Sequence, residues 1–521
     1  MTLIQSVFFL FVWFTPIKHS VHMFQQQHYC LDRYGPWLKM KVKNSKKAFF
    51  LWSVSTCGFY CLLRTNALQD GMFELLCSLY GVLFWRIESF QTYRKPLVYT
   101  ARIKRLLLMD GFILLMLLYL YTHMVPYTIF LITIPFLFEL PWLILILSAS
   151  CMQPIEDVIK KRYVKKAKKI LEDRNSMISI AITGSYGKTT VKNILYHLCK
   201  EEYYTLQTPH SYNNQMGITK TILEYLEPLH ELFLCEMGSD HVGELAFLMD
   251  LVQPQYGVVT SLGNQHLKTF KTKERICQEK MQVIEHLPEH GIGFLNRDCK
   301  ELVEYPIQNT CAIVWFGKDE DADYRYQLLQ YTKQGTLFSI THHGETRVFQ
   351  TTLLGEQAMQ NITCAVAVAD TLSVPFAIIE KQVRMLPSVP HRLEKKTYGR
   401  KTILDDAYNA NPVGFRYALD VLKTMEGQRI LVTPGCIDLG QEQDVENFRI
   451  GQYMADCIDD VIFVGIKQTE SMVKGLKKQQ FSSLHIYLAH SFEEAQTMLK
   501  QIASEDATIL LENDLPDAFH Q

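Results

Sequence analysis

The chain has 521 residues, enough for about three to four domains, and its 53 lysines and arginines nearly balance its 54 aspartates and glutamates. A formal net charge of −1 gives no electrostatic reason to expect a nucleic-acid partner. The 13 cysteines show neither a paired framework nor metal-ligand spacing, so we interpret them as small apolar residues that stay reduced.

The first 170 residues have the pattern of a multi-pass membrane region. Apolar stretches bounded by charge or turn residues occur at 3–16, 48–63, 71–87, 106–121 and 126–150. Several reach the length of about 17–25 residues that crosses hydrocarbon. Lysines and arginines gather in 18–47, after residue 87 and in 160–169, which the positive-inside rule places in the cytoplasm. The sequence therefore predicts about five transmembrane helices, or four, in the cell (inner) membrane, with the catalytic domains cytoplasmic.

Glu139 lies within the last of these apolar stretches. An ionisable group is costly at that depth, so Glu139 is either a functional residue inside a helix bundle or an interfacial residue beside Pro141 and Trp142.

From residue 171 onward, β-rich runs alternate with helical periods, which is typical of a mainly parallel sheet covered by helices. The candidate strands are 177–182, 232–236, 256–260, 292–295, 311–316, 402–406, 429–433, 460–464 and 507–511. The order is less regular between about 310 and 390, where 355–373 reads as one helix. We therefore expect an α-helical membrane region (1–170), a P-loop parallel-sheet ATPase domain (171–390) and a smaller Rossmann-like C-terminal domain (391–521).

A glycine-rich segment, 183–190, joins the first of these strands to an amphipathic helix at 191–199. Glycine lets successive N–H groups face one phosphate chain, and the helix N-terminus adds to the field there. Lys188 would neutralise the β- and γ-phosphate oxygens, and the Thr189 hydroxyl would hold Mg²⁺. The loop is a shorter variant of the usual pattern. Its expected nucleotide contacts are Gly184, Ser185, Tyr186, Gly187, Lys188, Thr189 and Thr190.

Further polar segments follow in an informative order. They are Tyr212-Asn-Asn-Gln-Met-Gly217, Cys235-Glu-Met-Gly238, Ser261-Leu-Gly-Asn-Gln-His266, Gln278-Glu-Lys280, Asn296-Arg-Asp298 and Leu404-Asp-Asp-Ala-Tyr-Asn-Ala-Asn-Pro412. At this point the chain resembles the ATP-dependent Mur ligases. The resemblance is carried by the phosphate loop, Glu236-Met-Gly-Ser-Asp-His-Val-Gly-Glu244, Asn296-Arg-Asp298 and the segment 404–412. The resemblance is nearest to the members that add D-alanyl-D-alanine to a muramyl tripeptide, and it covers about 177–450 well.

The resemblance implies roles for individual residues. It places Lys188 and Arg392 on the phosphates, Asn296 and Asn361 beside adenine, Asp406 on the ribose, and Thr189, Glu236, His266 and Lys280 around magnesium. Lys188, His266, Lys280 and Arg392 would be catalytic. Tyr408, Asn409 and Asn411 follow Asp406 in the next turn, and 435–442 resembles the loop near the incoming amine.

Each of these residues also has an ordinary structural interpretation. Glu236 ends an apolar run, so its carboxylate belongs at the carboxyl edge of the sheet, where it is a magnesium ligand or only solvated. A lone His266 is compatible with a structural role. Lys280 matches a lysine that many Mur ligases carry as a carbamate, but it also fits a solvated helix face.

The chain departs from the family pattern in several places. His391 replaces the usual glycine before Arg392, and 355–361 lacks the family's His-Asn pair. The tail, 510–517, lacks a Lys-Gly-Ser-Arg-like segment, and the membrane region stands where soluble ligases hold a uridine diphosphate sugar.

The chemistry implied by the resemblance is amide formation from a carboxylate activated by ATP, with Mg²⁺, through an acyl phosphate. The expected partners are ATP, an amino acid or dipeptide amine, a carboxylate acceptor from the cell envelope and membrane lipids. A lipid-linked acceptor is one hypothesis, and spans that only anchor the enzyme are another. The alternatives are a membrane-associated polyglutamate-like ligase and a non-catalytic nucleotide-binding scaffold.

Overall fold

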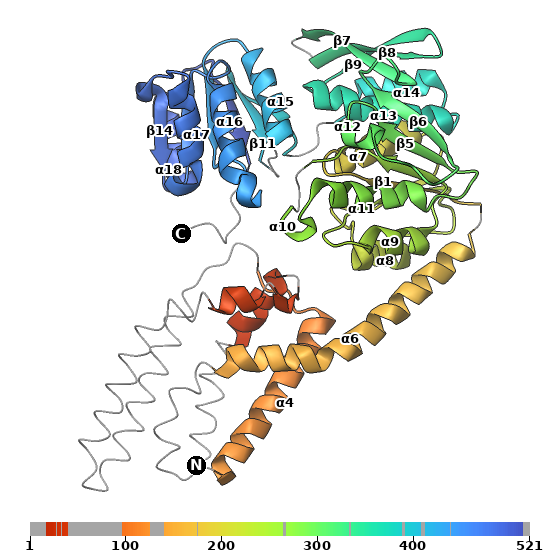
Figure 1. The fold of residues 1–521 in the computed structure, drawn as a ribbon, viewed down its shortest axis with the longest axis vertical. Helices are drawn as coiled ribbons and strands as arrows, with labels where there is room; N and C mark the ends of the chain where they lie inside the picture. The colour runs from red at the N-terminus through yellow and green to blue at the C-terminus, as the bar shows by residue number, and fades with distance from the viewer. Residues whose placement is uncertain are drawn as a thin grey trace. The chain divides into compact units, whose positions relative to one another are not determined.

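The computed structural model describes residues 17–27, 29–32, 34–39, 96–124, 140–174, 176–263, 267–332, 335–387, 391–407, 412–437 and 439–513. The chain divides into two compact units, Met1–Arg162 and Tyr163–Gln521. Figure 1 shows the elements of both units, each of which is described here by itself.

The first unit contains helix α4 (Ala101–Met124) and the first part of helix α6 (Leu140–Glu172). Its core joins these helices to residues 17–38 through buried side chains such as Phe24, Tyr34 and Trp142. The Glu156 carboxylate is buried and accepts two hydrogen bonds from the Arg105 guanidinium, at 2.7 and 2.9 Å.

The predicted membrane spans are only partly covered by the described residues. Spans 3–16, 48–63 and 71–87, together with Glu139, lie outside them, whereas 106–121 lies within α4 and 140–150 within α6. Among the described residues, one helix, Trp142–Glu172, is long and apolar enough to cross a membrane. The described part of the chain therefore does not by itself support a multi-span region.

The second unit begins with a nine-stranded sheet in the order β2-β3-β1-β4-β5-β6-β7-β8-β9. Its strands are β1 (Ile178–Thr183), β2 (Thr205–Gln207), β3 (Leu232–Glu236), β4 (Tyr256–Val259), β5 (Ile292–Asn296), β6 (Ala312–Gly317), β7 (Tyr324–Thr332), β8 (Gly335–His342) and β9 (Glu345–Thr351). The pairs from β2 to β7 are parallel, and β7, β8 and β9 are antiparallel. The less regular stretch expected after 310 therefore contains hairpins.

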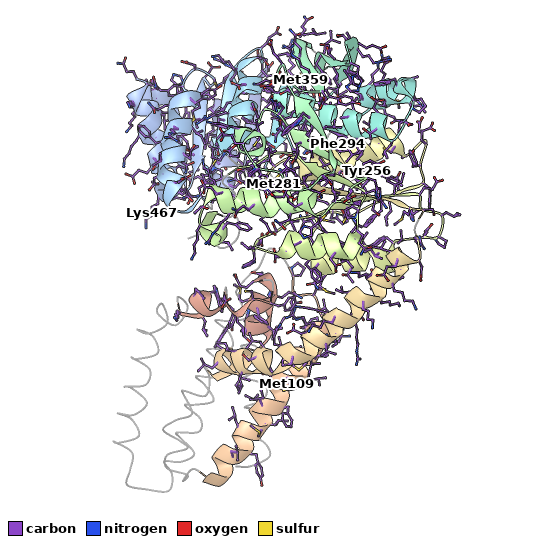
Figure 2. All side chains as sticks on the ribbon, turned by 45° about the vertical axis from the view of Figure 1, so that its right-hand side comes forward. Met109, Tyr256, Met281, Phe294, Met359 and Lys467 are labelled. Atoms are coloured by element: carbon purple, nitrogen blue, oxygen red, sulfur yellow. The ribbon has the colours of Figure 1, made fainter. Side chains whose placement is uncertain are left out.

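Helices cover both faces of this sheet, and each face has its own apolar core. One core includes residues of α7 (Lys188–Cys199), α13 (Glu356–Thr371) and α14 (Phe376–Arg384). The other includes residues of α8 (Gln215–Glu224), α9 (Glu244–Val252) and α11 (Lys273–Glu285). Of the residues labelled in Figure 2, Phe294 and Met359 belong to the first core and Met281 to the second. Two short helices, α10 (Leu267–Phe270) and α12 (Lys300–Val303), complete this part.

A separate six-stranded sheet follows, in the order β10-β11-β15-β12-β13-β14. Its strands are β10 (Glu394–Tyr398), β11 (Lys401–Asp406), β12 (Arg429–Thr433), β13 (Asp460–Val464), β14 (Ile486–Ala489) and β15 (Thr508–Glu512), and its helices are α15 (Pro412–Lys423), α16 (Gln443–Met454), α17 (Ile466–Lys478) and α18 (Phe492–Ile502). Only β10 runs antiparallel to its neighbour within this sheet. The α/β class with two parallel-rich sheets agrees with the sequence-based expectation.

Candidate active site

The phosphate loop connects β1 to α7, and its glycines are required by its geometry. Gly184 and Gly187 have φ values of 145° and 82°, which favour glycine. A Cβ at Gly184 would lie 2.2 Å from the Thr260 hydroxyl oxygen, and one at Gly187 would lie 2.7 Å from Oδ1 of Asn361. The Ser185 amide donates to the Ser261 carbonyl at 2.7 Å, so the segment that follows β4 holds the loop in place.

Lys188 opens helix α7 and is deeply placed within the loop. Its ammonium donates to the Gly184 and Ser185 carbonyls at 2.6 and 3.3 Å. Burial lowers the pKa of Lys188 to about 8, although the Glu236 carboxylate opposes this shift and the Arg392 cation adds to it. The Glu236 carboxylate and the Arg392 guanidinium therefore lie close enough to Lys188 to shift its pKa.

Glu236 ends strand β3 next to the loop, as expected, and its carboxylate is buried. Asn213 donates to Oε1 at 3.0 Å, and the ammonium of Lys192 lies 3.3 Å from Oε2. Lys192, on α7, also donates to the carbonyls of Thr208 and His210 at 2.8 and 3.0 Å. Because the carboxylate is buried at the sheet edge, the interpretation of Glu236 as a solvated strand end is wrong.

Lys280 lies on α11 and is 3% exposed, so the solvated-face interpretation of this lysine is also wrong. Its ammonium donates to the Ser239 hydroxyl at 2.8 Å, in the loop that follows β3. Burial, with a smaller contribution from the Lys188 cation, lowers the pKa of Lys280 to about 7. A neutral amine at this position can react with carbon dioxide to give a carbamate, whereas an ammonium cannot.

The two asparagines assigned to the adenine side have different surroundings. Asn361 is buried against Gly187 at the loop. Asn296 donates to the Thr260 carbonyl at 3.0 Å and accepts from the Asp298 amide at 3.0 Å. Its side chain therefore orders the end of β5, and the structure brings Asn361 but not Asn296 to the pocket described below.

Arg392 lies between two residues in the left-handed region, His391 at φ 59° and Leu393 at φ 50°. This conformation explains why the family pattern has glycine at the position of His391. The His391 ring lies 2.9 Å from the Asp405 carboxylate, and the Leu393 amide donates to the Asp406 carboxylate at 3.0 Å. The side chains of both β11 aspartates thus hold the segment that carries Arg392.

A pocket joins the phosphate loop to the C-terminal sheet. Its lining residues come from the loop and α7, from 353–361, and from the C-terminal part: Tyr186, Gly187, Thr190, Leu353, Leu354, Gly355, Gln357, Ala358, Asn361, Arg392, Leu393, Asp406, Gly414, Tyr417, Ala418 and Glu512. Arg392 and Asp406 line this pocket together with the phosphate loop. This arrangement agrees with a nucleotide site to which the C-terminal part contributes residues.

Some expected site residues lie outside the described ranges. These are His266, Tyr408, Asn409 and Asn411, and their predicted roles stay predictions.

Lys192, Ser239 and Glu512 were not singled out from the sequence, although the structure places all three among the candidate residues. A signal for Lys192 existed, because it lies one helical turn after Lys188 and therefore on the same face of α7. Ser239 lies within the segment 236–244, which carries the resemblance, so a sequence signal marked it as well. No comparable sequence signal marks Glu512, because its role depends on contacts between distant segments.

Comparison with known families matches two adjacent domain descriptions. Residues 182–369 match "Mur ligase middle domain", and residues 391–512 match "Mur ligase, glutamate ligase domain". The chain belongs to the Mur ligase family of enzymes. As a Mur ligase, it carries the middle domain around the phosphate loop and the glutamate ligase domain around Arg392 and Asp406.

Individual Mur ligases resemble this one over part of their length. The UDP-N-acetylmuramoyl-tripeptide–D-alanyl-D-alanine ligase of Escherichia coli is 30% identical over 298 residues, covering 56% of this chain and 65% of the relative. The Bacillus subtilis enzyme of the same name is 28% identical over 305 residues, covering 57% and 65%. The chain thus spans slightly less than two thirds of the length of these relatives.

A solved structure shows the same fold. MurF ligase from Thermotoga maritima in complex with ADP superposes with a TM-score of 0.62 at 24% identity, covering 68% of this chain and 80% of that one.

Proposed function

We propose that this Mur ligase is an ATP-dependent amide ligase that activates a carboxylate as an acyl phosphate. The observation that carries the proposal is that four charged side chains gather at one phosphate loop. Lys188 contacts the loop carbonyls, Lys280 contacts Ser239 in the segment after Glu236, and Arg392 lines the same pocket as Gly187. Three of these four charged side chains come from different elements of the middle domain, and the fourth comes from the glutamate ligase domain.

In the proposed reaction, the γ-phosphoryl group moves to the acceptor carboxylate and ADP leaves. The amine then attacks the acyl carbon, and the tetrahedral intermediate collapses to an amide and phosphate with loss of a proton from nitrogen. Lys188 neutralises the phosphate oxygens, and Arg392 adds positive charge from the glutamate ligase domain. The protein mainly positions the reactants and excludes water from the labile acyl phosphate.

The residues present suit Mg²⁺. Oε2 of Glu236 is buried and accepts no hydrogen bond among the described residues, although the Lys192 ammonium lies nearby. A hard anionic oxygen of this kind and the Thr189 hydroxyl are the ligands that Mg²⁺ prefers. A bound Mg²⁺ would supply charge neutralisation at the phosphates, and we expect Glu236, Thr189 and His266 to hold it.

The relatives' names suggest the substrates. We propose D-alanyl-D-alanine as the amine and a UDP-muramyl tripeptide, or a related cell-envelope precursor, as the acceptor in peptidoglycan synthesis. A polyglutamate-like product is the alternative.

We also propose that the enzyme is held at the inner membrane with its catalytic domains in the cytoplasm. Within the first unit, α4 exposes large apolar side chains, among them Leu108, Phe112 and Tyr119 at 75, 65 and 62%. The last part of α6 carries a run of exposed lysines and one arginine, which suits anionic headgroups. These features support a lipid-linked acceptor as a hypothesis within the same function.

The test is release of ADP and phosphate by the detergent-purified full chain, with Lys188→Ala as the control. The two acceptors compared are UDP-muramyl tripeptide and its lipid-linked counterpart, each with D-alanyl-D-alanine. Turnover that Lys188→Ala abolishes supports the ligase, and a preference for the lipid-linked form supports the membrane hypothesis. No turnover on either acceptor would contradict these substrates and favour the polyglutamate-like ligase or the scaffold.

A further inference from the structure

Lys192 is a buried lysine on α7, one helical turn after Lys188, and its ammonium lies among three oxygen acceptors. It donates to the carbonyls of Thr208 and His210 at 2.8 and 3.0 Å, and it lies 3.3 Å from Oε2 of Glu236. An ammonium has three donors, so three acceptors suit it. The positive charge of Lys192 is therefore held in one place beside the phosphate loop.

The Glu236 carboxylate is held by the same segment that holds Lys192. The Glu236 amide donates to the Thr208 hydroxyl at 3.1 Å, and the Asn213 side chain donates to Oε1 of Glu236 at 3.0 Å. The Asn213 carbonyl in turn accepts from the Gly238 amide at 2.7 Å. Moving the carboxylate away from the ammonium would break buried hydrogen bonds, so the separation of the two charges is fixed by the fold.

This arrangement places a fixed cation next to the oxygen that we expect to hold Mg²⁺. Like charges repel, and the repulsion is stronger in a buried site than in water. Lys188 also acts electrostatically on Glu236, so two cations of α7 already balance the carboxylate. The phosphate chain of ATP brings negative charge to the same loop and can offset this repulsion. Metal binding at Glu236 should therefore be weak by itself and strong together with ATP.

We propose that Lys192 is a built-in counter-cation of Glu236 that prevents a divalent cation from binding there before ATP does. The proposal rests on the proposed ATP-dependent function and deepens it, because it assigns a regulator to the same site. Lys192 acts through Glu236 and not on the substrates, so it is a positioning residue. The protein thereby makes its metal site depend on the nucleotide.

The experiment counts the Mn²⁺ that the detergent-purified full chain retains in equilibrium ultrafiltration, without nucleotide and with ATP. Mn²⁺ is the probe because it shares the preference of Mg²⁺ for carboxylate oxygens. Lys192→Gln is the main variant, since its amide can still donate to the two carbonyls but carries no charge. Lys192→Met is the second variant, and Lys192→Gln with Glu236→Gln removes the carboxylate as well.

Arg105→Gln is the matched control, because it takes the nearest cation from another buried carboxylate, that of Glu156 in the first unit. The thermal unfolding midpoint of every variant, with and without Mn²⁺, is the second readout. It reports whether each variant is folded, and it is independent of catalytic activity.

Without nucleotide, Lys192→Gln and Lys192→Met should bind Mn²⁺ about tenfold or more tightly than the wild type does. Mn²⁺ should also raise their unfolding midpoints more than that of the wild type, because it supplies the missing counter-charge. The double variant should lose both gains, and Arg105→Gln should show neither. In the wild type, ATP should increase the retention of Mn²⁺.

Equal Mn²⁺ affinity of Lys192→Gln and the wild type without nucleotide would overturn the counter-cation role. The metal site itself would stand in that case if ATP raises Mn²⁺ retention in both proteins. If the wild type retains no Mn²⁺ even with ATP, the magnesium site and this proposal fail together, while ADP release remains the separate test of the ligase.

Discussion

At the scale of single residues, the buried pair of Lys192 and Glu236 gives a stability prediction. Both side chains are 2% exposed, and the ammonium also satisfies two carbonyls. Lys192→Met leaves the Glu236 carboxylate buried without its counter-charge, which should lower the free energy of unfolding by about 3–5 kcal/mol. The thermal unfolding midpoint measures this. Lys192→Met with Glu236→Gln should recover much of the loss, and an unchanged midpoint in the single variant would contradict the assignment.

Lys280 gives a prediction that depends on pH. Its pKa of about 7 lies below the ordinary lysine value of about 10.4, so the folded protein favours the neutral amine, and this fraction falls as the pH drops through 7. If the amine becomes a carbamate, removal of dissolved carbon dioxide should lower the rate of ADP release, and bicarbonate should restore it. Restoration should weaken below pH 7. Bicarbonate labelled with ¹³C should give a carbamate signal that Lys280→Arg lacks.

At the scale of elements, the strand-to-helix loop predicts a contrast between two glycines with nearly the same φ. Gly187 and Gly344 have φ values of 82° and 81°, but only a Cβ at Gly187 meets another atom, Oδ1 of Asn361. Both Gly→Ala variants should show the left-handed cost of about 1–2 kcal/mol. Gly187→Ala should also weaken ATP binding, measured by calorimetry. Equal ATP affinity in both variants would show that the contact with Asn361 does not matter.

The elements also show what the sequence could reveal. Buried parallel strands such as β1, β3 and β12 are apolar runs, so their positions could be predicted from composition alone. The three-residue strand β2 is too short for a pattern, and β7 to β9 mix polar and apolar residues because they form an antiparallel extension at one edge of the sheet. Site residues at strand ends were predictable for the same reason, whereas the contacts of Lys192 and Glu512 depend on tertiary packing.

At the scale of the whole molecule, the pocket is lined by residues of both Mur ligase domains. We therefore expect bound ATP to contact both domains and to raise the free energy of unfolding. ATP at about one hundred times its dissociation constant should stabilise the protein by about 2.7 kcal/mol. Arg392→Ala should reduce the rise in the unfolding midpoint at the same ATP concentration, and Lys188→Ala should nearly abolish it. A full rise in Arg392→Ala would show that the glutamate ligase domain does not contribute to binding.

The whole-molecule organisation was only partly predictable. The Mur ligase character of the last 350 or so residues follows from short motifs in a fixed order, and the family comparison confirms it over 182–369 and 391–512. The membrane topology rests on hydropathy and charge alone. These properties indicate which segments prefer an apolar environment, but they do not show which helices pack against one another. The number of spans therefore stays a prediction.

The backbone at His391 has a consequence for how such enzymes are found. A histidine occupies a left-handed position where the family pattern has glycine, and its ring is fixed by Asp405. A left-handed main-chain position can therefore be occupied by a residue other than glycine when a neighbouring side chain holds that residue. A search that demands glycine before the arginine would pass over this chain, whereas a search for the bend and its anchoring acid would recover it and any relatives with the same substitution.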